Sequence, residues 1–348
     1  MSVHILDAMA REGFEELTAL HERRSGLRAF LAVHDSTRGP AFGGIRRWEY
    51  RDETAALVDC LRLARAMSHK CALADLEAGG GKIVVLAREG TDWDAAYAHL
   101  GRVIERMGGR FYTGPDVGTG PEQLAAMSRE TSYVTDPGPE GPGQLAESTA
   151  EGVFRSIEAC LEHQDGEADW PSRLVVVQGL GSVGANLARR LVELDAKVFG
   201  ADLDEELAER TCSSLGLELL EPSRAVDTAC DVFAPCAMGG ILHDVTLGRL
   251  SARIVAGGAN NVLVKPLHGD RLHERGILVA PDFVVNSGAL IRGTIFHLEG
   301  RREPVEAIGE RIKGIVKAVL VRAGEEDAPP SRVAVREAEE RIEARRRA

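Results

Sequence analysis

The sequence is poor in cysteine and has no long apolar run. Its six cysteines are scattered over 348 residues and form no CxxC pair. This pattern argues against disulfides and structural zinc, and it predicts reduced thiols, no bound metal and a cytoplasmic location. The longest apolar stretches, such as Leu174–Val177, are only strand-sized, so no membrane span is expected. Residues 1–10 lack the basic start and apolar core of a signal peptide.

Positive charge is also in short supply. The formal net charge is −12, and a nucleic-acid-binding surface must be basic to neutralise phosphates, so nucleic acid is not an expected partner. Arginine supplies most of the 42 basic residues, and the only lysines are Lys70, Lys82, Lys197, Lys265, Lys313 and Lys317. Where a lysine occurs in so arginine-rich a chain, its ammonium group is a candidate for chemistry.

A proline- and glycine-rich stretch divides the chain. Residues 136–143 read DPGPEGPG, which interrupts helix and strand and predicts a linker between two domains. After the linker, strands and helices alternate, which predicts a doubly wound parallel α/β sheet. The expected strands there are 174–178, 197–201, 231–234, 253–256 and 277–280, and the expected helices are 147–161, 182–194 and 204–214. Before the linker we expect strands at 27–34 and 82–87 and helices at 54–67 and 92–107.

A glycine-rich loop after the first of these parallel strands predicts a dinucleotide site. The strand ends at Gln178, and the loop that follows has the GxGxxG spacing. The glycines permit a tight turn, a close approach of the pyrophosphate and close helix packing, while the helix N-terminus attracts phosphate. The next strand ends in Asp202, where a carboxylate can bind a ribose 2′-hydroxyl and would repel a 2′-phosphate. NAD is therefore preferred over NADP. The predicted cofactor residues in the loop are Gly179, Leu180, Gly181, Ser182, Val183 and Gly184.

Three glycine-flanked segments before the linker carry the reactive side chains. They are residues 39–46, residues 67–82 with Lys70 and Lys82, and residues 113–119 with Asp116. Three glycines precede Lys82, which we expect to leave room for substrate or water near its ammonium group. Two ammonium groups brought together repel one another, so that one can lose its proton and act as a base. Taken alone, each lysine fits a surface ion pair better than a functional role.

These segments, in this order, resemble the leucine/phenylalanine/valine dehydrogenase branch of the amino-acid dehydrogenases related to glutamate dehydrogenase. The resemblance covers nearly the whole chain, including residues 144–152, 234–237, 256–261 and 280–288. It implies an N-terminal α/β substrate domain and a Rossmann dinucleotide-binding domain, with the cleft between them. The expected domains are residues 1–138, joined by a C-terminal helix at about 325–348, and residues 144–324. The chain ends earlier than the longer members do, and a homo-oligomer is expected.

The resemblance also implies roles for single residues. Lys82 would be the general base, and Asp116 would exchange protons with the amino group. Lys70 would bind the substrate carboxylate, helped by the backbone of Gly44 and the amide of Asn286, with Met67 nearby. Three further residues resemble contacts to the nicotinamide half of the cofactor, namely Thr149, Ala237 and Asn260.

The expected side-chain pocket favours a hydrophobic substrate. Phe42 stands where glutamate-specific relatives carry a lysine, and burying an unpaired carboxylate against it would cost several kcal/mol. Gly114, Leu290 and Gly293 resemble the opposite wall, and the small residues would leave room for an aromatic ring. Phenylalanine or tryptophan is therefore favoured, with a branched-chain substrate such as leucine or valine as the alternative. Arg292 stands where a neutral amide is common, and it fits either a solvated helix charge or an additional substrate contact.

A third alternative belongs to a different class, a NAD-binding protein that has lost catalysis and acts as a sensor or partner subunit. The presence of Lys70, Lys82 and Asp116 argues against it.

Overall fold

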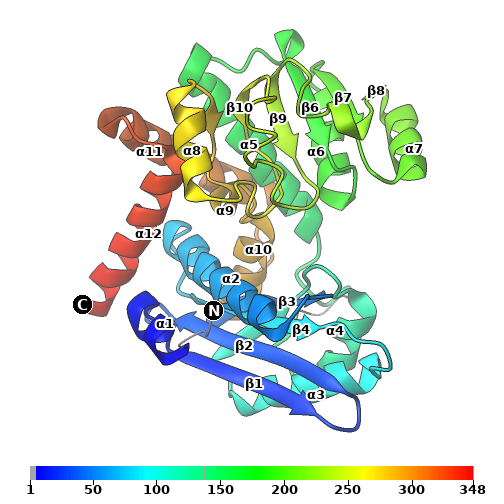
Figure 1. The fold of residues 1–348 in the computed structure, drawn as a ribbon, viewed down its shortest axis with the longest axis vertical. Helices are drawn as coiled ribbons and strands as arrows, with labels where there is room; N and C mark the ends of the chain where they lie inside the picture. Colours follow the sequence, from blue (N-terminus) through cyan, green and yellow to red (C-terminus); the bar gives the residue numbers. More distant parts are fainter. Residues whose placement is uncertain (1–4, 136–137, 348) are drawn as a thin grey trace. The chain divides into compact units, whose positions relative to one another are not determined.

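The structure is a computed structural model that describes residues 5–135 and 138–347, so Asp136 and Pro137 of the expected linker lie outside the described residues. The chain folds as two compact units (Figure 1). Unit 1 comprises Met1–Gly143, Gly293–Arg302 and Ala338–Ala348, and unit 2 comprises Gln144–Arg292 and Glu303–Glu337. The segment 293–302 thus folds with the N-terminal part of the chain, and the C-terminal return begins at Ala338.

Unit 1 is built on a five-stranded mixed sheet with the order β1-β2-β4-β3-β5. Strands β3, β4 and β5 are parallel, and β1 and β2 are antiparallel to their neighbours. Its strands are β1 (Glu16–Glu22), β2 (Leu27–Asp35), β3 (Ala41–Trp48), β4 (Gly79–Leu86) and β5 (Phe111–Gly114). Its helices are α1 (Ile5–Glu12), α2 (Glu53–Leu73), α3 (Trp93–Arg106) and α4 (Pro121–Ser128), with the second half of α10 (Gly288–Glu299) and the end of α12 (Pro330–Arg347).

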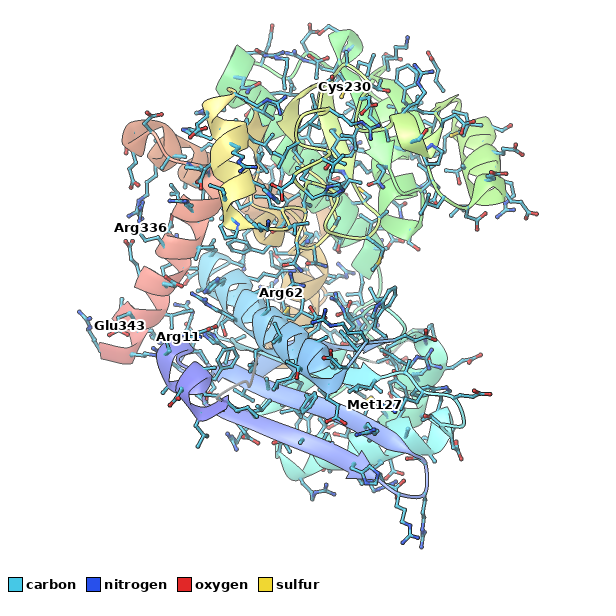
Figure 2. The ribbon with its side chains drawn as sticks, viewed as in Figure 1. Arg11, Arg62, Met127, Cys230, Arg336 and Glu343 are labelled. Atoms are coloured by element: carbon cyan, nitrogen blue, oxygen red, sulfur yellow. The ribbon has the colours of Figure 1, made fainter. Side chains whose placement is uncertain are left out.

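Helices cover both faces of this sheet. On one face α3 and α4 bury Ile45, Ile83 and Met127 in one core, and on the other face α2 packs on Ala32 and Val84 in a second core (Figures 1 and 2). The N-cap carboxylates of α2 and α3 accept backbone hydrogen bonds, as expected for helix starts. The predicted strands at 27–34 and 82–87 and both predicted helices are confirmed, whereas β1, β3 and β5 were not predicted.

Unit 2 carries a six-stranded sheet with the order β11-β10-β9-β6-β7-β8, and every pair in it is parallel. This is the Rossmann order, in which the chain reverses direction across the sheet between β6 and β9. The strands are β6 (Leu174–Gln178), β7 (Lys197–Ala201), β8 (Glu218–Leu219), β9 (Cys230–Pro235), β10 (Ala252–Val255) and β11 (Leu278–Val279). The doubly wound α/β prediction is confirmed.

Helices on both faces of this sheet complete unit 2. The helices that lie wholly in unit 2 are α5 (Leu145–Asp165), α6 (Ser182–Val192), α7 (Glu205–Leu215), α8 (Pro266–Glu274), α9 (Asp282–Val285) and α11 (Val305–Glu326). The first part of α10 and the start of α12 also belong to this unit. The short 3₁₀ turns are η1 (Trp170–Ser172) and η2 (Pro222–Arg224). No helix of residues 5–135 and 138–347 is both long and apolar enough to cross a bilayer.

The C-terminal end of α12 is bound to unit 1 by arginines. Arg346 pairs with Asp35 at 2.6 Å, and the Asp35 side chain is only 2% exposed. Arg341 donates to the carbonyl oxygens of Ala72 and Leu73, which end α2. The basic tail of the chain is therefore a set of packing contacts, and its positive charge is largely used within the protein.

Candidate active site

Strand alternation in unit 1 gathers the reactive residues on one face of the sheet. Side chains two residues apart on a strand point to the same face, so Phe42, Gly44 and Arg46 of β3 share a face. Register places Phe42 beside Gly80 of β4 and Tyr112 of β5. Two residues further along β3, Gly44 pairs with Gly114 of β5. The next residue, Ile45, pairs with Ile83 of β4, so Gly44 lies level with Lys82 of β4. The α2 face of the sheet therefore presents Lys82, with Asp116 just beyond the end of β5.

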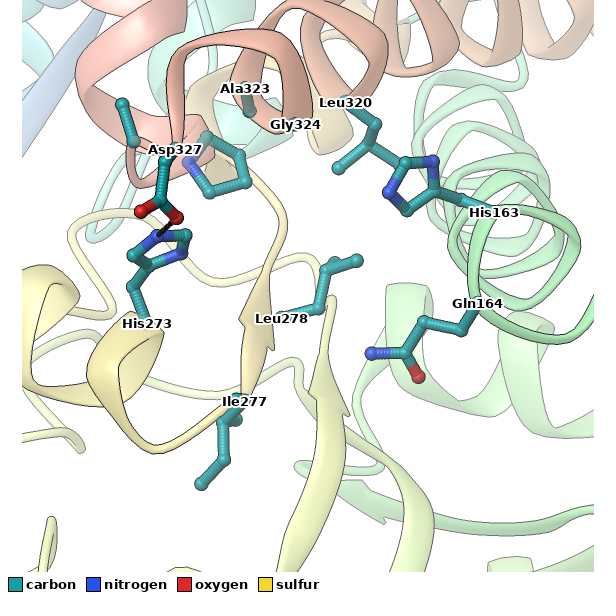
Figure 3. A pocket seen from close by; sticks show the side chains of 12 residues that line it. His163, Gln164, His273, Ile277, Leu278, Leu320, Ala323, Gly324 and Asp327 are labelled. Atoms are coloured by element: carbon teal, nitrogen blue, oxygen red, sulfur yellow. Dashed lines mark hydrogen bonds and ion pairs between the residues drawn. The ribbon is translucent and has the colours of Figure 1, made fainter.

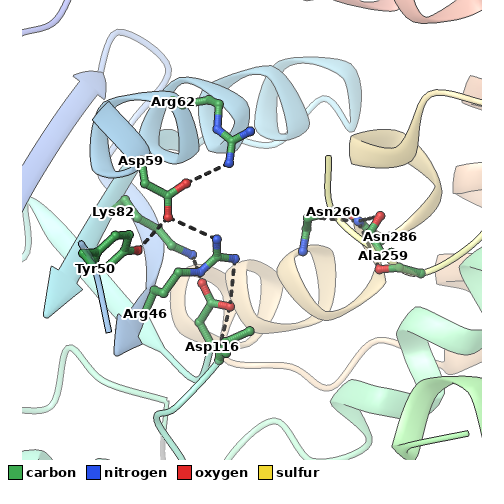
Figure 4. A network of polar contacts seen from close by, with 11 residues as sticks. Arg46, Tyr50, Asp59, Arg62, Lys82, Asp116, Ala259, Asn260 and Asn286 are labelled. Carbon is green, nitrogen blue, oxygen red and sulfur yellow. Dashed lines mark hydrogen bonds and ion pairs between the residues drawn. The ribbon is translucent and has the colours of Figure 1, made fainter. Parts of the chain in front are cut away.

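Lys82 and Asp116 form an ion pair across this face (Figure 4). The Lys82 side chain is 7% exposed and that of Asp116 is 13% exposed. Arg46 lies on the other side of the carboxylate, with its Nη2 3.5 Å from Asp116 Oδ1. Two cations thus flank one buried carboxylate, and the structure brings together the predicted base and the predicted proton-exchanging acid.

The two cations keep Asp116 ionised. Burial by itself raises the pKa of a carboxyl group, but the charges of Lys82 and Arg46 outweigh it and hold the pKa of Asp116 well below its usual range. The backbone N–H of Val117 also donates to Asp116 Oδ1 at 2.7 Å. In the resting protein a negative charge therefore lies beside the Lys82 ammonium, where it can stabilise a positive charge that develops on a substrate.

Arg46 connects this carboxylate to a second acid, Asp59 of α2 (Figure 4). Arg46 Nη1 lies 3.3 Å from Asp59 Oδ2, which also accepts a 2.7 Å hydrogen bond from the Tyr50 hydroxyl. Arg62 reaches Asp59 Oδ1 at 2.8 Å. Burial by itself would raise the pKa of Asp59, but these hydrogen bonds and charges outweigh burial, so the pKa of Asp59 lies below its usual value. Asp59 thus holds Arg46 in the orientation that serves Asp116.

The glycines around Lys82 have a different role from the one expected. A Cβ on Gly80 would lie 2.0 Å from Ser68 N of α2, and one on Gly81 would lie 2.3 Å from the ring of Phe111. A Cβ on Gly44 would lie 2.6 Å from the carbonyl oxygen of Pro115. The glycines therefore allow the helix, the strands and the loop that carries Asp116 to pack closely, which fixes the reactive side chains.

The remaining predicted residues of unit 1 divide between α2 and the end of the sheet. Lys70 is 8% exposed on α2, and Met67 is half-buried one turn before it. A Cβ on Gly114 would lie 2.9 Å from Thr135 Oγ1, so the small residue at this position accommodates Thr135 and adds no room for a substrate. A Cβ on Gly293 would meet no atom within 4 Å, so this glycine does face open space.

Phe42 belongs to an aromatic cluster that the sequence did not reveal. Its ring stacks on Tyr112 with centroids 4.8 Å apart and planes 3° apart. Tyr112 meets Tyr133 edge-on at 5.3 Å, and His297 lies 5.1 Å from Tyr112 and 6.2 Å from Phe42. Stacked and edge-on rings form this wall, which therefore suits an apolar side chain.

In unit 2 the glycine loop has the geometry that its sequence predicts. Gly179 follows β6 with φ +96°, and its Cβ position lies 2.6 Å from Ala237 N, just past β9. A Cβ on Gly184 would lie 1.8 Å from Gly179 O, so the helix α6 can pack here only because the residue is glycine. A Cβ on Gly181 would meet nothing, and Gly181 and Ser182 are exposed at the α6 N-terminus. The loop, with Leu180 and Val183, therefore lies at the switch point between β6 and β9, where dinucleotides bind in this fold.

Asp202, at the end of β7, is held against this loop. Its Oδ2 accepts a 2.7 Å hydrogen bond from the backbone N–H of Leu180, and its Oδ1 accepts one from Asp204 N at 3.0 Å. Both contacts leave carboxylate lone pairs for a ribose hydroxyl. Acidic side chains continue through Asp204 and Glu205 into the first turn of α7, so a 2′-phosphate would meet negative charge here.

Asn286 and Asn260 form a second polar group in unit 2. Asn286 Nδ2 donates to the carbonyl oxygens of Gly258 and Ala259 and, at 2.9 Å, to Asn260 Oδ1. Its buried Oδ1 has no hydrogen-bond partner among the described residues. In this orientation the amide therefore offers an acceptor, which suits an ammonium group better than the carboxylate that the resemblance implied.

Thr149 and Arg292 connect helices within unit 2. Thr149 Oγ1 accepts a 3.2 Å hydrogen bond from Ala289 N, next to Leu290 in α10. Arg292 is 4% exposed, donates to the carbonyl oxygen of Glu303, and has its Nη2 3.1 Å from Gln144 Oε1. Arg292 is thus a buried contact between chain segments and is not a solvated helix charge.

Unit 2 also contains a cavity of about 290 Å³ that includes none of the predicted cofactor residues (Figure 3). It lies between the end of α5, the edge strand β11 and the end of α11, and its polar side chains include His163, Gln164 and the His273–Asp327 pair. None of the predicted catalytic or substrate-binding residues lines it either.

The sequence analysis assigned no role to Arg46, Asp59, Tyr112 or His297. Arg46 was visible two residues after Gly44, on the same side of an extended segment, but its partners come from α2 and from the loop after β5. Those contacts depend on the pairing of strands that the sequence did not predict.

Comparisons with known proteins agree with this arrangement. The family model described as "Glu/Leu/Phe/Val dehydrogenase, dimerisation domain" matches residues 16–133, and the model "Glutamate/Leucine/Phenylalanine/Valine dehydrogenase" matches residues 205–339. The leucine dehydrogenase of Geobacillus stearothermophilus is 39% identical over 338 residues, covering 96% of this chain and 92% of that enzyme. The L-tryptophan dehydrogenase of Nostoc punctiforme is 40% identical over 288 residues, covering 82% of this chain and 81% of that enzyme.

A solved structure extends the similarity to the fold. The crystal structure of L-tryptophan dehydrogenase from Nostoc punctiforme superposes with a TM-score of 0.82 at 36% identity, covering 99% of this chain and 100% of that one. With a Rossmann sheet in one unit and the Lys82–Asp116 pair in the other, the chain belongs to the glutamate/leucine/phenylalanine/valine dehydrogenase family and is an amino-acid dehydrogenase.

Proposed function

We propose that this enzyme uses NAD to deaminate a hydrophobic L-amino acid oxidatively and reversibly, giving a 2-oxo acid and ammonia, with an aromatic substrate favoured. The Lys82–Asp116 ion pair carries the proposal, because a lysine base beside an ionised carboxylate matches what the reaction needs. The pair lies on the same face of the sheet as Phe42, whose aromatic surroundings suit an apolar side chain.

The roles of the residues follow from their chemistry. Lys70 and the backbone of Gly44 bind the substrate carboxylate, and Asp116 takes a proton from the substrate ammonium group and stabilises the positive imine that follows. When bound, NAD would supply the acceptor for the hydride that leaves Cα. Once Lys82 has released its proton to solvent, it takes a proton from the water that attacks the imine carbon. Asp116 then returns its proton to the amine, and the hydroxyl proton passes to the departing ammonia as the C–N bond breaks and the C=O bond forms. Arg46 keeps Asp116 ionised between these steps.

NAD is the proposed cofactor because Asp202 stands at the end of β7 and adjoining acids would repel a 2′-phosphate. The glycine loop and the N-terminus of α6 would hold the pyrophosphate. Thr149, Ala237 and Asn260 would contact the nicotinamide half, as the resemblance implies. Asn286, with its free Oδ1, would orient the substrate ammonium group.

A branched-chain substrate is the second candidate, and the similarity to the Geobacillus stearothermophilus leucine dehydrogenase favours it. The similarity to the Nostoc punctiforme L-tryptophan dehydrogenase favours the aromatic one. An apolar pocket separates substrates by only about 1–3 kcal/mol per methylene, so both classes can be turned over to some extent. Open space at Gly293 favours the larger side chain.

We also propose that the chain assembles as a homo-oligomer in the cytoplasm. The matched model for residues 16–133 is described as a dimerisation domain. Strand β1 lies at the edge of the unit 1 sheet and can pair with a second copy. All six cysteines are free thiols, and five of them are buried, which suits a reducing compartment. Light scattering coupled to size-exclusion chromatography tests the assembly, and a monomeric mass would contradict it.

A substrate panel tests the proposed reaction. We expect formation of NADH, read by absorbance, with phenylalanine and tryptophan at a higher kcat/KM than with leucine, and no formation with glutamate. A higher kcat/KM for leucine would establish the second candidate. Binding of NAD without turnover of any amino acid would instead indicate a catalytically inactive NAD-binding protein.

A further inference from the structure

His297 continues the face of α10 that carries the expected pocket residues. Leu290, Gly293 and His297 are spaced by three and four residues, so they share one side of the helix. Gly293 is buried, yet its Cβ position has no atom within 4 Å, so the helix faces a void there. His297 stands one turn further along the same side of the helix.

The same histidine belongs to the aromatic cluster around Phe42. Its ring centroid lies 5.1 Å from Tyr112 at 50°, 6.2 Å from Phe42 at 51° and 5.5 Å from Phe296 at 79°. All four residues belong to unit 1. Burial lowers the pKa of His297 below its ordinary value of 6.5, so the ring is neutral near pH 7.

One nitrogen of this ring lacks a partner. The Nε2 atom of His297 is buried and makes no hydrogen bond to any described residue. A buried polar atom without a partner costs about 1–3 kcal/mol, and a ligand that completes the hydrogen bond recovers this cost. A neutral imidazole that carries its proton on Nδ1 presents Nε2 as an acceptor. The complementary group is an N–H donor on the edge of a flat, apolar side chain.

We propose that His297 is a specificity-determining residue that accepts a hydrogen bond from the indole N–H of tryptophan and so selects tryptophan over phenylalanine and leucine. This inference rests on the proposed amino-acid dehydrogenase function. The indole ring has the apolar faces that Phe42 and Tyr112 match, and tryptophan is the proteinogenic amino acid that combines a large aromatic surface with a ring N–H donor.

The test compares L-tryptophan with 3-benzothienylalanine, which replaces the indole N–H by sulfur and keeps the shape. In the wild type we expect kcat/KM for tryptophan to exceed that for the sulfur analogue by about tenfold, as for one buried hydrogen bond. His297→Phe keeps an aromatic ring without the acceptor, so the ratio should fall to about one while kcat/KM for phenylalanine stays within about threefold. His297→Gln keeps an acceptor and should retain part of the preference.

The control is His99→Phe, the same substitution on the partly exposed helix α3, which should leave the ratio unchanged. A wild-type ratio near one, a ratio unaffected by His297→Phe, or turnover of leucine without tryptophan would overturn the assignment of His297. Failure to oxidise any amino acid would overturn the proposed function itself, so the two failures are distinguishable. If His297→Phe does not fold, the wild-type ratio and the His297→Gln variant still decide.

Discussion

Lys82 and Asp116 form their ion pair across β3, although Lys82 belongs to β4 and Asp116 follows β5. The two residues can meet because β3 carries glycine at position 44, on the same face and between β4 and β5. A Cβ on Gly44 would lie 2.6 Å from the carbonyl oxygen of Pro115 and 3.1 Å from Asp116 Cβ. The absence of a side chain at this position of the central strand thus lets the acid approach the base.

Replacing Lys82 by alanine should abolish turnover and leave cofactor binding intact. The proposed base would be gone, and loss of general base catalysis typically costs about 10²–10⁴-fold in rate. Steady-state NADH formation measures kcat, and NADH fluorescence measures the Kd of the cofactor. The control Lys82→Arg keeps the charge beside Asp116 but cannot lose its proton at neutral pH, so it should fold normally and remain inactive. Retained turnover in either variant would contradict a base at this position.

The two acids that Arg46 contacts should differ in their effects. Asp116→Asn removes the charge beside Lys82 and should lower kcat by about 10²-fold or more. Asp59→Asn leaves Lys82 and Asp116 in place and removes only the carboxylate that orients Arg46, so we expect a loss below about tenfold. Steady-state kinetics on both variants measure this difference. Equal losses would show that Asp116 has no direct part in the reaction and acts only through the network.

The architecture of unit 2 could be predicted from the sequence, and much of unit 1 could not, for a physical reason. The order strand, GxGxxG loop, helix is local, so the loop around Gly179 and the position of Asp202 at the end of the next strand can be predicted from spacing alone. Strand β3 contains two glycines and two arginines and lacks the apolar alternation that marks a strand. Its partners lie far along the chain, so the pairing that brings Arg46 to Asp116 could not be deduced from local pattern.

The same limit applies to the side-chain pocket. The sequence shows that Phe42 cannot pair a carboxylate, but the stacking of its ring on Tyr112 depends on strand register. The small size of Gly114 was ascribed to room for a substrate ring. In the structure Thr135, which the sequence places 21 positions later, lies next to that space.

Asp202→Ala should weaken cofactor binding without affecting the reactive residues of unit 1. The carboxylate accepts a hydrogen bond from Leu180 N and would accept one from the ribose, so we expect the Kd for NAD to rise by about 10–100-fold, as for a hydrogen bond to a charged group. Discrimination against NADP should fall as well.

The matched control is Asp204→Ala, two residues later. Asp204 is the N-cap of α7, and its side chain accepts a hydrogen bond from Leu207 N. That variant should lower the melting temperature and leave the Kd for NAD within about threefold. Similar Kd values for the two variants would contradict the role given to Asp202.

The burial of His69 should lower the stability of unit 1 at acid pH. Burial, helped by the charge of Arg65, lowers the pKa of His69 from 6.5 to about 3. Above pH 6.5 the residue is neutral in both states and its contribution is complete. Between about pH 6.5 and 3 the unfolded chain binds a proton that the folded protein does not, so the free energy of unfolding should fall by roughly 1 kcal/mol for each pH unit of acidification.

Urea unfolding at a series of pH values measures this slope. His69→Gln should reduce this slope. Part of the slope should remain, because burial also lowers the pKa of His34. The control His21→Gln, at an exposed position of β1, should leave the slope unchanged. An unchanged slope in His69→Gln would show that His69 is already protonated in the folded protein, with Glu339 Oε1, 3.9 Å from its Nε2, as the compensating charge.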